Sequence, residues 1–79
     1  MGRTIPTVRQ SMDMLAARLQ KMAEIMNSDD ADNLNSILVK GRRHAHEVSY
    51  AGIDVDYGFL LSMMLELEKE LKKLREGLE

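Results

Sequence analysis

The chain has 79 residues, no cysteine, 30% charged residues and a formal net charge of −2 at pH 7. A chain of this length forms one domain at most, and a single core is barely sufficient to stabilise it. The composition excludes a disulfide scaffold and gives no His/Cys quartet for a structural zinc site. Self-association is therefore the remaining common source of extra stability.

No apolar run approaches the roughly 18 residues that a membrane span requires. The N-terminal stretch also lacks the continuous apolar segment of a signal peptide. The sequence therefore predicts a cytoplasmic protein with no membrane partner. The net charge by itself argues neither for nor against nucleic acid, so the distribution of charge matters more.

The first predicted helix covers about residues 6–27. Its apolar positions recur in steps of four and three residues, which is typical of an amphipathic helix: Val8, Met12, Leu15, Leu19, Met22 and Met26. Two starts are possible. Thr4 as N-cap places Pro6 in the first turn, whereas Thr7 as N-cap pairs with Gln10 in a capping box.

The second predicted helix covers about residues 30–49, with Ser28 or Asp29 as its cap. Gly41 and Ala45 lie four residues apart on one side of it, where they would let another backbone approach closely. Glycine costs about 1 kcal/mol relative to alanine in a helix interior. A packing role for Gly41 is therefore expected.

The third predicted helix covers about residues 55–77 and follows Gly52, which can end the preceding helix in the left-handed conformation. Its first half is apolar around most of its circumference, and its second half keeps one apolar seam among charges, as in a coiled coil. Short connections favour an antiparallel up-down-up bundle of three helices. The all-α fold, one domain over residues 1–79, would be completed by homodimerisation into a larger bundle. The expected dimer interface is Phe59, Leu60, Met63, Met64, Leu67, Leu71 and Leu74.

Basic side chains are predicted to converge at one pole of this bundle, where the first helix begins and the second ends. Arginine grips phosphate oxygens in bidentate fashion, so the pole is a candidate anion or nucleic-acid site. Alternatively, Asp54 and Asp56 neutralise the arginines in an internal ion network. The candidate binding residues are Arg3, Arg9, Arg42, Arg43 and His46.

Metal binding and catalysis find little support in the sequence. His44 and His46 are two residues apart, so on a helix they point about 200° from each other. Glu47 can join His44 at i+3, but no third ligand is evident. Glu66 and Glu70, with lysines nearby, are expected to form solvent-side ion pairs. They do not match the magnesium-binding pattern of all-helical nucleotide pyrophosphohydrolases, so neither an enzyme nor a cofactor is predicted.

The N-terminal segment G-R-T-I-P-T-V-R, together with R-R-H-A at 42–45 and L-L-S at 60–62, suggests a family. The chain resembles a group of small uncharacterised archaeal helical proteins that open with a G-R-T-x-P-T-x-R-like segment. This resemblance implies a compact helical protein whose N-terminal arm is more than a disordered leader. It implies no activity.

Two functions follow as hypotheses. The first is a non-enzymatic interaction or structural protein that self-associates through the third helix and can receive a protein partner. The second is a nucleic-acid-associated accessory or regulatory protein that uses the basic pole.

Overall fold

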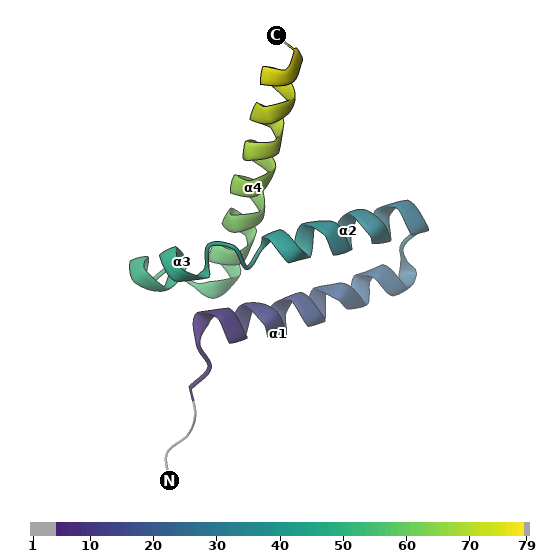
Figure 1. Ribbon diagram of the computed structural model, residues 1–79. Coiled ribbons are helices and arrows are strands. Elements are labelled where there is room, and N and C mark those ends of the chain that lie inside the picture. Colours follow the sequence, from purple (N-terminus) through teal and green to yellow (C-terminus); the bar gives the residue numbers. More distant parts are fainter. Residues whose placement is uncertain (1–4, 79) are drawn as a thin grey trace.

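The computed structural model describes residues 5–78, which form four α-helices and one 3-10 helix. They are α1 (Val8–Gln20), η1 (Lys21–Ile25), α2 (Ser28–Lys40), α3 (Ala45–Ala51) and α4 (Val55–Leu78). The described residues contain no strand, so the predicted all-α class is confirmed. Figure 1 shows α1 and α2 side by side in an antiparallel hairpin, α3 continuing past α2, and α4 rising steeply away from the hairpin.

The first helix begins as a capping box predicts. The Gln10 backbone N–H donates to Thr7 Oγ1 at 3.1 Å, and the Thr7 N–H donates to Gln10 Oε1 at 2.9 Å. Of the two possible starts, the structure therefore has Thr7 as the N-cap. The helix predicted to run to residue 27 tightens into η1 after Gln20 and ends at Met26, whose backbone is extended.

The cap of α2 differs from the prediction. Asn27, rather than Ser28 or Asp29, is the N-cap, and its side-chain oxygen accepts a 2.8 Å hydrogen bond from the Asp30 N–H. Asp29 and Asp30 lie in the first turn, where carboxylates interact favourably with the positive end of the helix dipole.

The helix predicted over 30–49 is divided into α2 and α3 by a turn at residues 41–44. Gly41 shows why. A Cβ at this position would lie 2.5 Å from Cζ of Phe59, so an aromatic ring, rather than another backbone, occupies the space that glycine leaves. Three i to i−3 backbone bonds of 3.3 Å span the turn, in place of the α-helical ladder. The turn redirects Arg43 and His44 towards α4.

Gly52 ends α3 in the left-handed conformation at φ 68°, as predicted. The following helix has 24 residues and is about 36 Å long. Because α4 projects from the hairpin instead of lying along it, the up-down-up packing is not confirmed (Figure 1). The radius of gyration of 14.9 Å exceeds the roughly 12 Å expected of a compact chain of this length.

The buried core is small. It consists of Met12, Leu38, Val48, Phe59 and Met63. Phe59 and Met63 were predicted to face a partner chain, but the structure places both inside the single subunit, against the hairpin. No helix within residues 5–78 combines the length and apolar character needed to cross a membrane.

Candidate functional site

An exposed apolar surface runs along α4, beside the flank that packs against the hairpin. We call it the outer seam, and it consists of Leu60, Met64, Leu67, Leu71, Leu74 and Leu78. At 100° per residue these six positions fall within about 80° of one another. Leu67 is partly buried, and the other five are exposed. The exposed fractions include 53% at Leu60, 65% at Met64 and 66% at Leu74.

The adjoining flank of α4 is used by the subunit itself. Phe59 and Ser62 are buried there, and the Ser62 hydroxyl donates to the Gly58 carbonyl at 2.8 Å. Gly58 permits close contact with α3, since a Cβ there would lie 2.5 Å from a methyl group of Val48. Of the predicted interface residues, Leu60, Met64, Leu67, Leu71 and Leu74 therefore share the outer seam, while Phe59 and Met63 do not.

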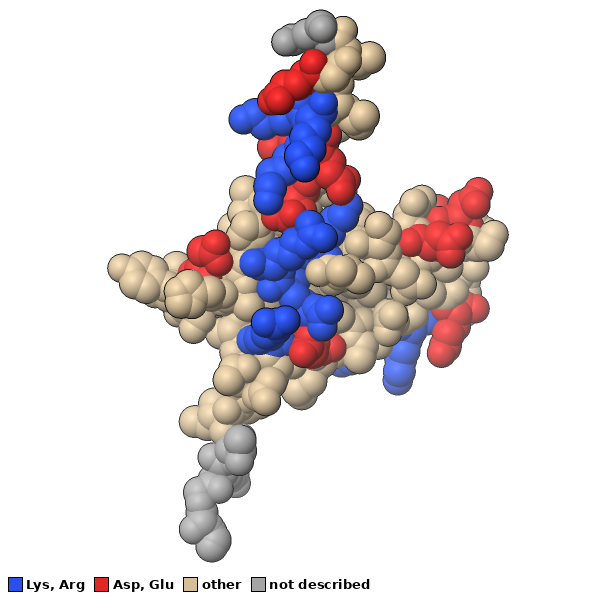
Figure 2. Space-filling model, in the orientation of Figure 1, with Lys and Arg blue, Asp and Glu red and all other residues tan. Residues whose placement is uncertain are grey.

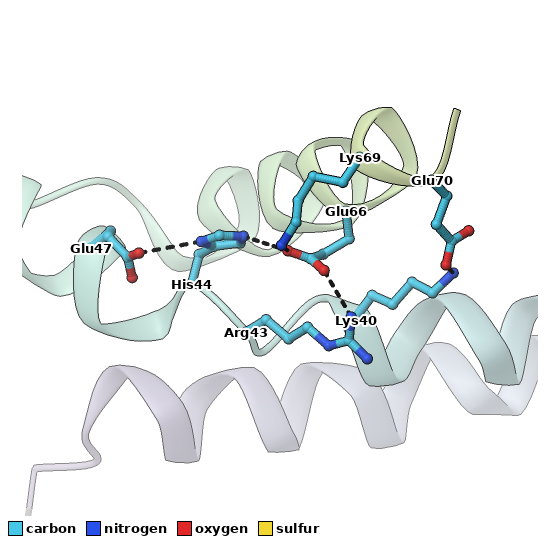
Figure 3. Close-up of polar contacts among 7 residues, drawn as sticks. All are labelled: Lys40, Arg43, His44, Glu47, Glu66, Lys69 and Glu70. Carbon is cyan, nitrogen blue, oxygen red and sulfur yellow. Dashed lines mark hydrogen bonds and ion pairs between the residues drawn. The ribbon is translucent and has the colours of Figure 1, made fainter. Parts of the chain in front are cut away.

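A buried carboxylate joins the turn at 41–44 to α4, as Figure 3 shows. Glu66 is only 4% exposed and accepts hydrogen bonds from three side chains. Oε1 receives Arg43 Nη1 at 2.7 Å. Oε2 lies 2.8 Å from His44 Nε2 and 3.1 Å from Lys69 Nζ.

These partners set the charge of Glu66. The Arg43 hydrogen bond, followed by those of Lys69 and His44, lowers the pKa of the carboxyl from 4.5 to about 2, against the opposing effect of burial. Lys40 and Glu70 add a neighbouring ion pair of 2.6 Å between α2 and α4. The network is a structural clamp, because the carboxylate oxygens are occupied by donors.

This role of Glu66 was not predicted from the sequence, which indicated an ion pair on the solvent side of the helix. The available signal was its spacing from Phe59 and Ser62, seven and four residues earlier, which places all three on one side of a helix. The lysine pairing was predicted, but the arginine and histidine partners depend on the turn that ends α2.

Three of the predicted anion-binding residues do come together. Arg9, Arg42 and Arg43 line one shallow hollow, and Arg9 also lines a neighbouring hollow with His46. Arg3 lies outside the described residues. Figure 2 shows Lys and Arg side chains in a nearly continuous band on this face, from α4 down across the body of the molecule.

The arginines are neutralised by different carboxylates from those predicted. Arg42 forms a 2.6 Å ion pair with Asp13 of α1, and Arg43 pairs with Glu66, whereas Asp54 and Asp56 form no ion pair within residues 5–78. The Arg42 and Arg43 side chains nevertheless stay 40% and 53% exposed. Among the described residues, no carboxylate lies within ion-pair distance of Arg9.

His44 and Glu47 do approach each other, with 3.3 Å between Nδ1 and Oε2. His44 is thus a hydrogen-bonded residue next to a helix end, with carboxylates at both ring nitrogens. In the part of the chain that the structure describes, no three His, Cys, Asp or Glu side chains are grouped to hold a metal ion.

The sequence matches one family over residues 1–79, described as Domain of unknown function (DUF8156). No curated protein and no solved structure shows significant similarity. The match agrees with the expectation of an uncharacterised family. The archaeal source and the N-terminal motif of that family stay predictions.

Proposed function

Since the chain belongs to this family of unknown function, we propose from its surface chemistry that it is a non-enzymatic helical interaction protein. It acts as a homodimer that pairs through the outer seam of α4 and so completes a larger helical bundle. Its compartment is proposed to be the cytoplasm, because a cysteine-free chain gains nothing from an oxidising environment.

The observation that carries this proposal is the exposure of the outer seam. Leucine and methionine side chains on a soluble helix are normally covered, and contiguous exposed apolar patches mark interaction sites. Here 54% of Leu71 and 88% of Leu78 are open to solvent within one subunit. The hairpin does not cover them, because it packs against a different flank of α4 and the last buried residue of this helix is Glu66.

The total surface supports the same conclusion. The accessible area is 6382 Å², whereas a compact monomer of 9.0 kDa would expose about 4,900 Å². A typical stable interface takes about 800 Å² from each partner. The chain therefore exposes enough extra area to supply its share of such an interface.

The non-enzymatic part of the proposal is supported by the state of Glu66. It is the one deeply buried carboxylate among the described residues, and such groups are frequent candidates for acid–base catalysis. Its oxygens are already engaged by Arg43, His44 and Lys69, which hold it ionised. A carboxylate in this position ties the turn at 41–44 to α4.

A matched pair of variants tests the proposal. Leu71→Glu places a charge on the outer seam at a position that makes no part of the core, so we expect a folded monomer. Lys72→Glu changes charge one residue away, off the seam, and should remain dimeric. Sedimentation velocity at equal concentrations gives the association state, and far-ultraviolet circular dichroism verifies that both variants are folded. Equal sedimentation of Leu71→Glu and the unmodified chain would refute the proposal.

A second candidate function rests on the hollow lined by Arg9, Arg42 and Arg43. Three arginines that line one depression suit a phosphate-bearing partner, and Figure 2 shows further Lys and Arg side chains towards α4, with acidic side chains among them. The alternative proposal is a nucleic-acid-associated accessory or regulatory protein. The chain has only two Tyr, one Phe and no Trp for stacking on bases, so contacts to phosphates would dominate.

Titration of labelled single-stranded and duplex oligonucleotides over a range of salt concentrations tests this candidate. Phosphate contacts release counterions, so the logarithm of the affinity should fall steeply with the logarithm of salt concentration. Arg9→Gln should weaken binding and reduce that slope, whereas Arg18→Gln, at the other end of α1, should not. The absence of binding at low salt would remove the candidate.

A further inference from the structure

The residues that flank the outer seam distinguish between the two directions in which a second α4 can pack. Leu60, Met64, Leu67, Leu71, Leu74 and Leu78 alternate between the d and a positions of a heptad repeat. The e positions are then Leu61, Glu68 and Arg75, and the g positions are Met63, Glu70 and Gly77. In a two-stranded coiled coil these flanking residues set partner choice and orientation.

Parallel pairing brings opposite charges together. Each g residue then lies beside the e residue five positions later on the partner, so Glu70 faces the partner's Arg75. Two-fold symmetry makes this contact twice. Glu70 meets its own Lys40 through Oε1, which leaves Oε2 free for the partner. The side chain of Glu70 is 54% exposed. Arg75 pairs with its own Glu68 through Nη2 at 3.3 Å, but it stays 67% exposed and has a second guanidinium nitrogen to offer, so both side chains can reach across.

Antiparallel pairing brings like charges together. Full overlap of the two seams places Leu67 opposite the partner's Leu71 and Leu60 opposite the partner's Leu78. The flanking contacts are then g with g and e with e. Glu70 faces the partner's Glu70, and Glu68 faces the partner's Glu68. Like-charge contacts of this kind act against the pairing.

The location of the hairpin favours the same orientation. It packs on one flank of α4, and Leu61 and Leu65 project from the opposite flank with exposed fractions of 45% and 44%. In a parallel dimer the two-fold axis runs parallel to α4. The partner's hairpin then lies on the flank that carries Leu61 and Leu65, at the same level along the helix. An axis perpendicular to α4 keeps both hairpins on one flank, so both leucine pairs stay uncovered.

We propose that the occupant of the outer seam is the α4 helix of a second copy, parallel and in register, with reciprocal contacts between Glu70 and the partner's Arg75. This inference rests on the self-association proposed above and adds its orientation. Both hairpins then lie at the same end of the dimer, and the two charged C-terminal halves of α4 form a short coiled coil. Its seam spans less than three heptads, so it depends on the apolar residues near the hairpin for part of its stability.

Cysteine pairing tests the orientation, since the chain has no cysteine of its own. Leu60→Cys and Leu78→Cys are made as separate full-length variants, one labelled with ¹⁵N, and mixed in equal amounts in a glutathione redox buffer. In the parallel dimer each introduced thiol faces its own counterpart. In the antiparallel dimer residue 60 faces residue 78, and two residues 78 are about 27 Å apart, too far for a disulfide.

Mass spectrometry of the disulfide-linked dimers gives the result. The proposal predicts an excess of homodisulfides, with both chains labelled or both unlabelled. An excess of mixed disulfides, or a statistical distribution, would overturn the parallel register. Sedimentation of the same proteins in the reduced state distinguishes a wrong orientation from a lack of self-association. A dimer with mixed disulfides refutes only the orientation, whereas a monomer refutes the self-association on which it rests.

Discussion

The inner side of α4 and its outer seam both carry large apolar side chains but have different surroundings. On the inner side, Phe59 is 0% exposed and Glu66 is 4% exposed. On the outer seam, Leu60 is 53% exposed and Leu74 is 66% exposed. The hairpin of α1 and α2 is wide enough to cover one side of the helix and leaves the other open. The inner side of α4 therefore packs the core of the subunit, and we propose that its outer seam forms the contact with a second copy.

The same contrast exists along the helix. Near the hairpin, α4 is held by the core and by the Glu66 clamp. Residues 71–78 are all exposed, and Figure 1 shows the end of the helix projecting away from the hairpin. An isolated helix of this length is marginally stable in water, so the projecting half has most to gain from a partner. Substitutions on the inner side should consequently reduce the stability of the subunit, and substitutions on the outer seam should reduce association.

The largest effect is expected for Phe59→Ala. The ring is fully buried and lies against Gly41, so its removal leaves a cavity in a small core. Such truncations cost about 3–5 kcal/mol, which should unfold much of the population. Tyr57→Ala, at a residue 73% exposed, is the control and should change stability very little. Urea denaturation followed by circular dichroism measures both, and similar midpoints would contradict the assignment of the core.

Gly41→Ala should be the next most harmful change. Alanine favours helix by about 1 kcal/mol over glycine, but here its Cβ would lie 2.5 Å from the Phe59 ring. Overpacking of this kind costs about 1–3 kcal/mol, so the net effect should be destabilising. Gly77→Ala is the matched control, because nothing lies within 4 Å of its Cβ position. It should stabilise the chain slightly, and stabilisation at both positions would contradict the described packing.

The lowered pKa of Glu66 should make the stability of the fold depend on pH. Its pKa is lowered from 4.5 to about 2 in the folded chain, mainly by Arg43. The stability that it contributes is therefore fully present above pH 4.5 and is lost as the pH falls towards 2. Glu66→Gln should reduce the free energy of unfolding at pH 7 and flatten its fall over that interval. Denaturant titrations at several pH values measure both quantities.

Glu70→Gln provides the comparison for that prediction. Glu70 has one ion-pair partner, Lys40, and is 54% exposed, so its replacement should change stability less than Glu66→Gln at every pH. If Glu66→Gln left the pH dependence of the free energy of unfolding unchanged and Glu70→Gln changed it more, the hydrogen bonds assigned to Glu66 would not be the ones that stabilise the fold.

The smallest effect is expected for Arg75→Glu. In the parallel dimer this change places a glutamate beside the partner's Glu70, twice per dimer. Exposed pairs of this kind contribute a few tenths of a kcal/mol each, so the dissociation constant should rise several-fold. Adding Glu70→Lys together with Lys40→Glu reverses the charges of both contacts and keeps the pair within the subunit, so association should be restored. Sedimentation at increasing concentrations measures the constants, and failure of this triple variant to recover would argue against the Glu70–Arg75 contact.

The sequence predicted the features that depend on local chemistry. The helical class and the left-handed Gly52 follow from patterns a few residues long, and the capping box of Thr7 and Gln10 was one of the two helix starts that the sequence left open. Features that depend on distant parts of the chain were not predicted. The turn at 41–44 forms where Phe59 packs against Gly41, and these residues are far apart in the sequence. The contacts of the buried Glu66 depend on the same turn, because it places Arg43 and His44 within hydrogen-bond distance of the carboxylate.

The candidate sites were also predicted only in part. The periodicity of α4 correctly indicated an apolar seam, but it gave no means of deciding which side the hairpin would cover. Phe59 and Met63 were therefore grouped with the interface, although they belong to the core. The convergence of Arg9, Arg42 and Arg43 was predicted from helix direction. Their pairing with Asp13 and Glu66 was not, since the first pair depends on how α1 packs against the end of α2 and the second on how α4 packs against the turn at 41–44.

Sedimentation equilibrium of the unmodified chain, from low micromolar to near-millimolar concentration, is the most direct measurement. If the outer seam of α4 pairs with a second copy, the average mass should rise with concentration towards twice the 9.0 kDa of the single chain and stop there. A mass that stays at 9.0 kDa over the whole range would show that the exposed leucines of α4 do not serve self-association.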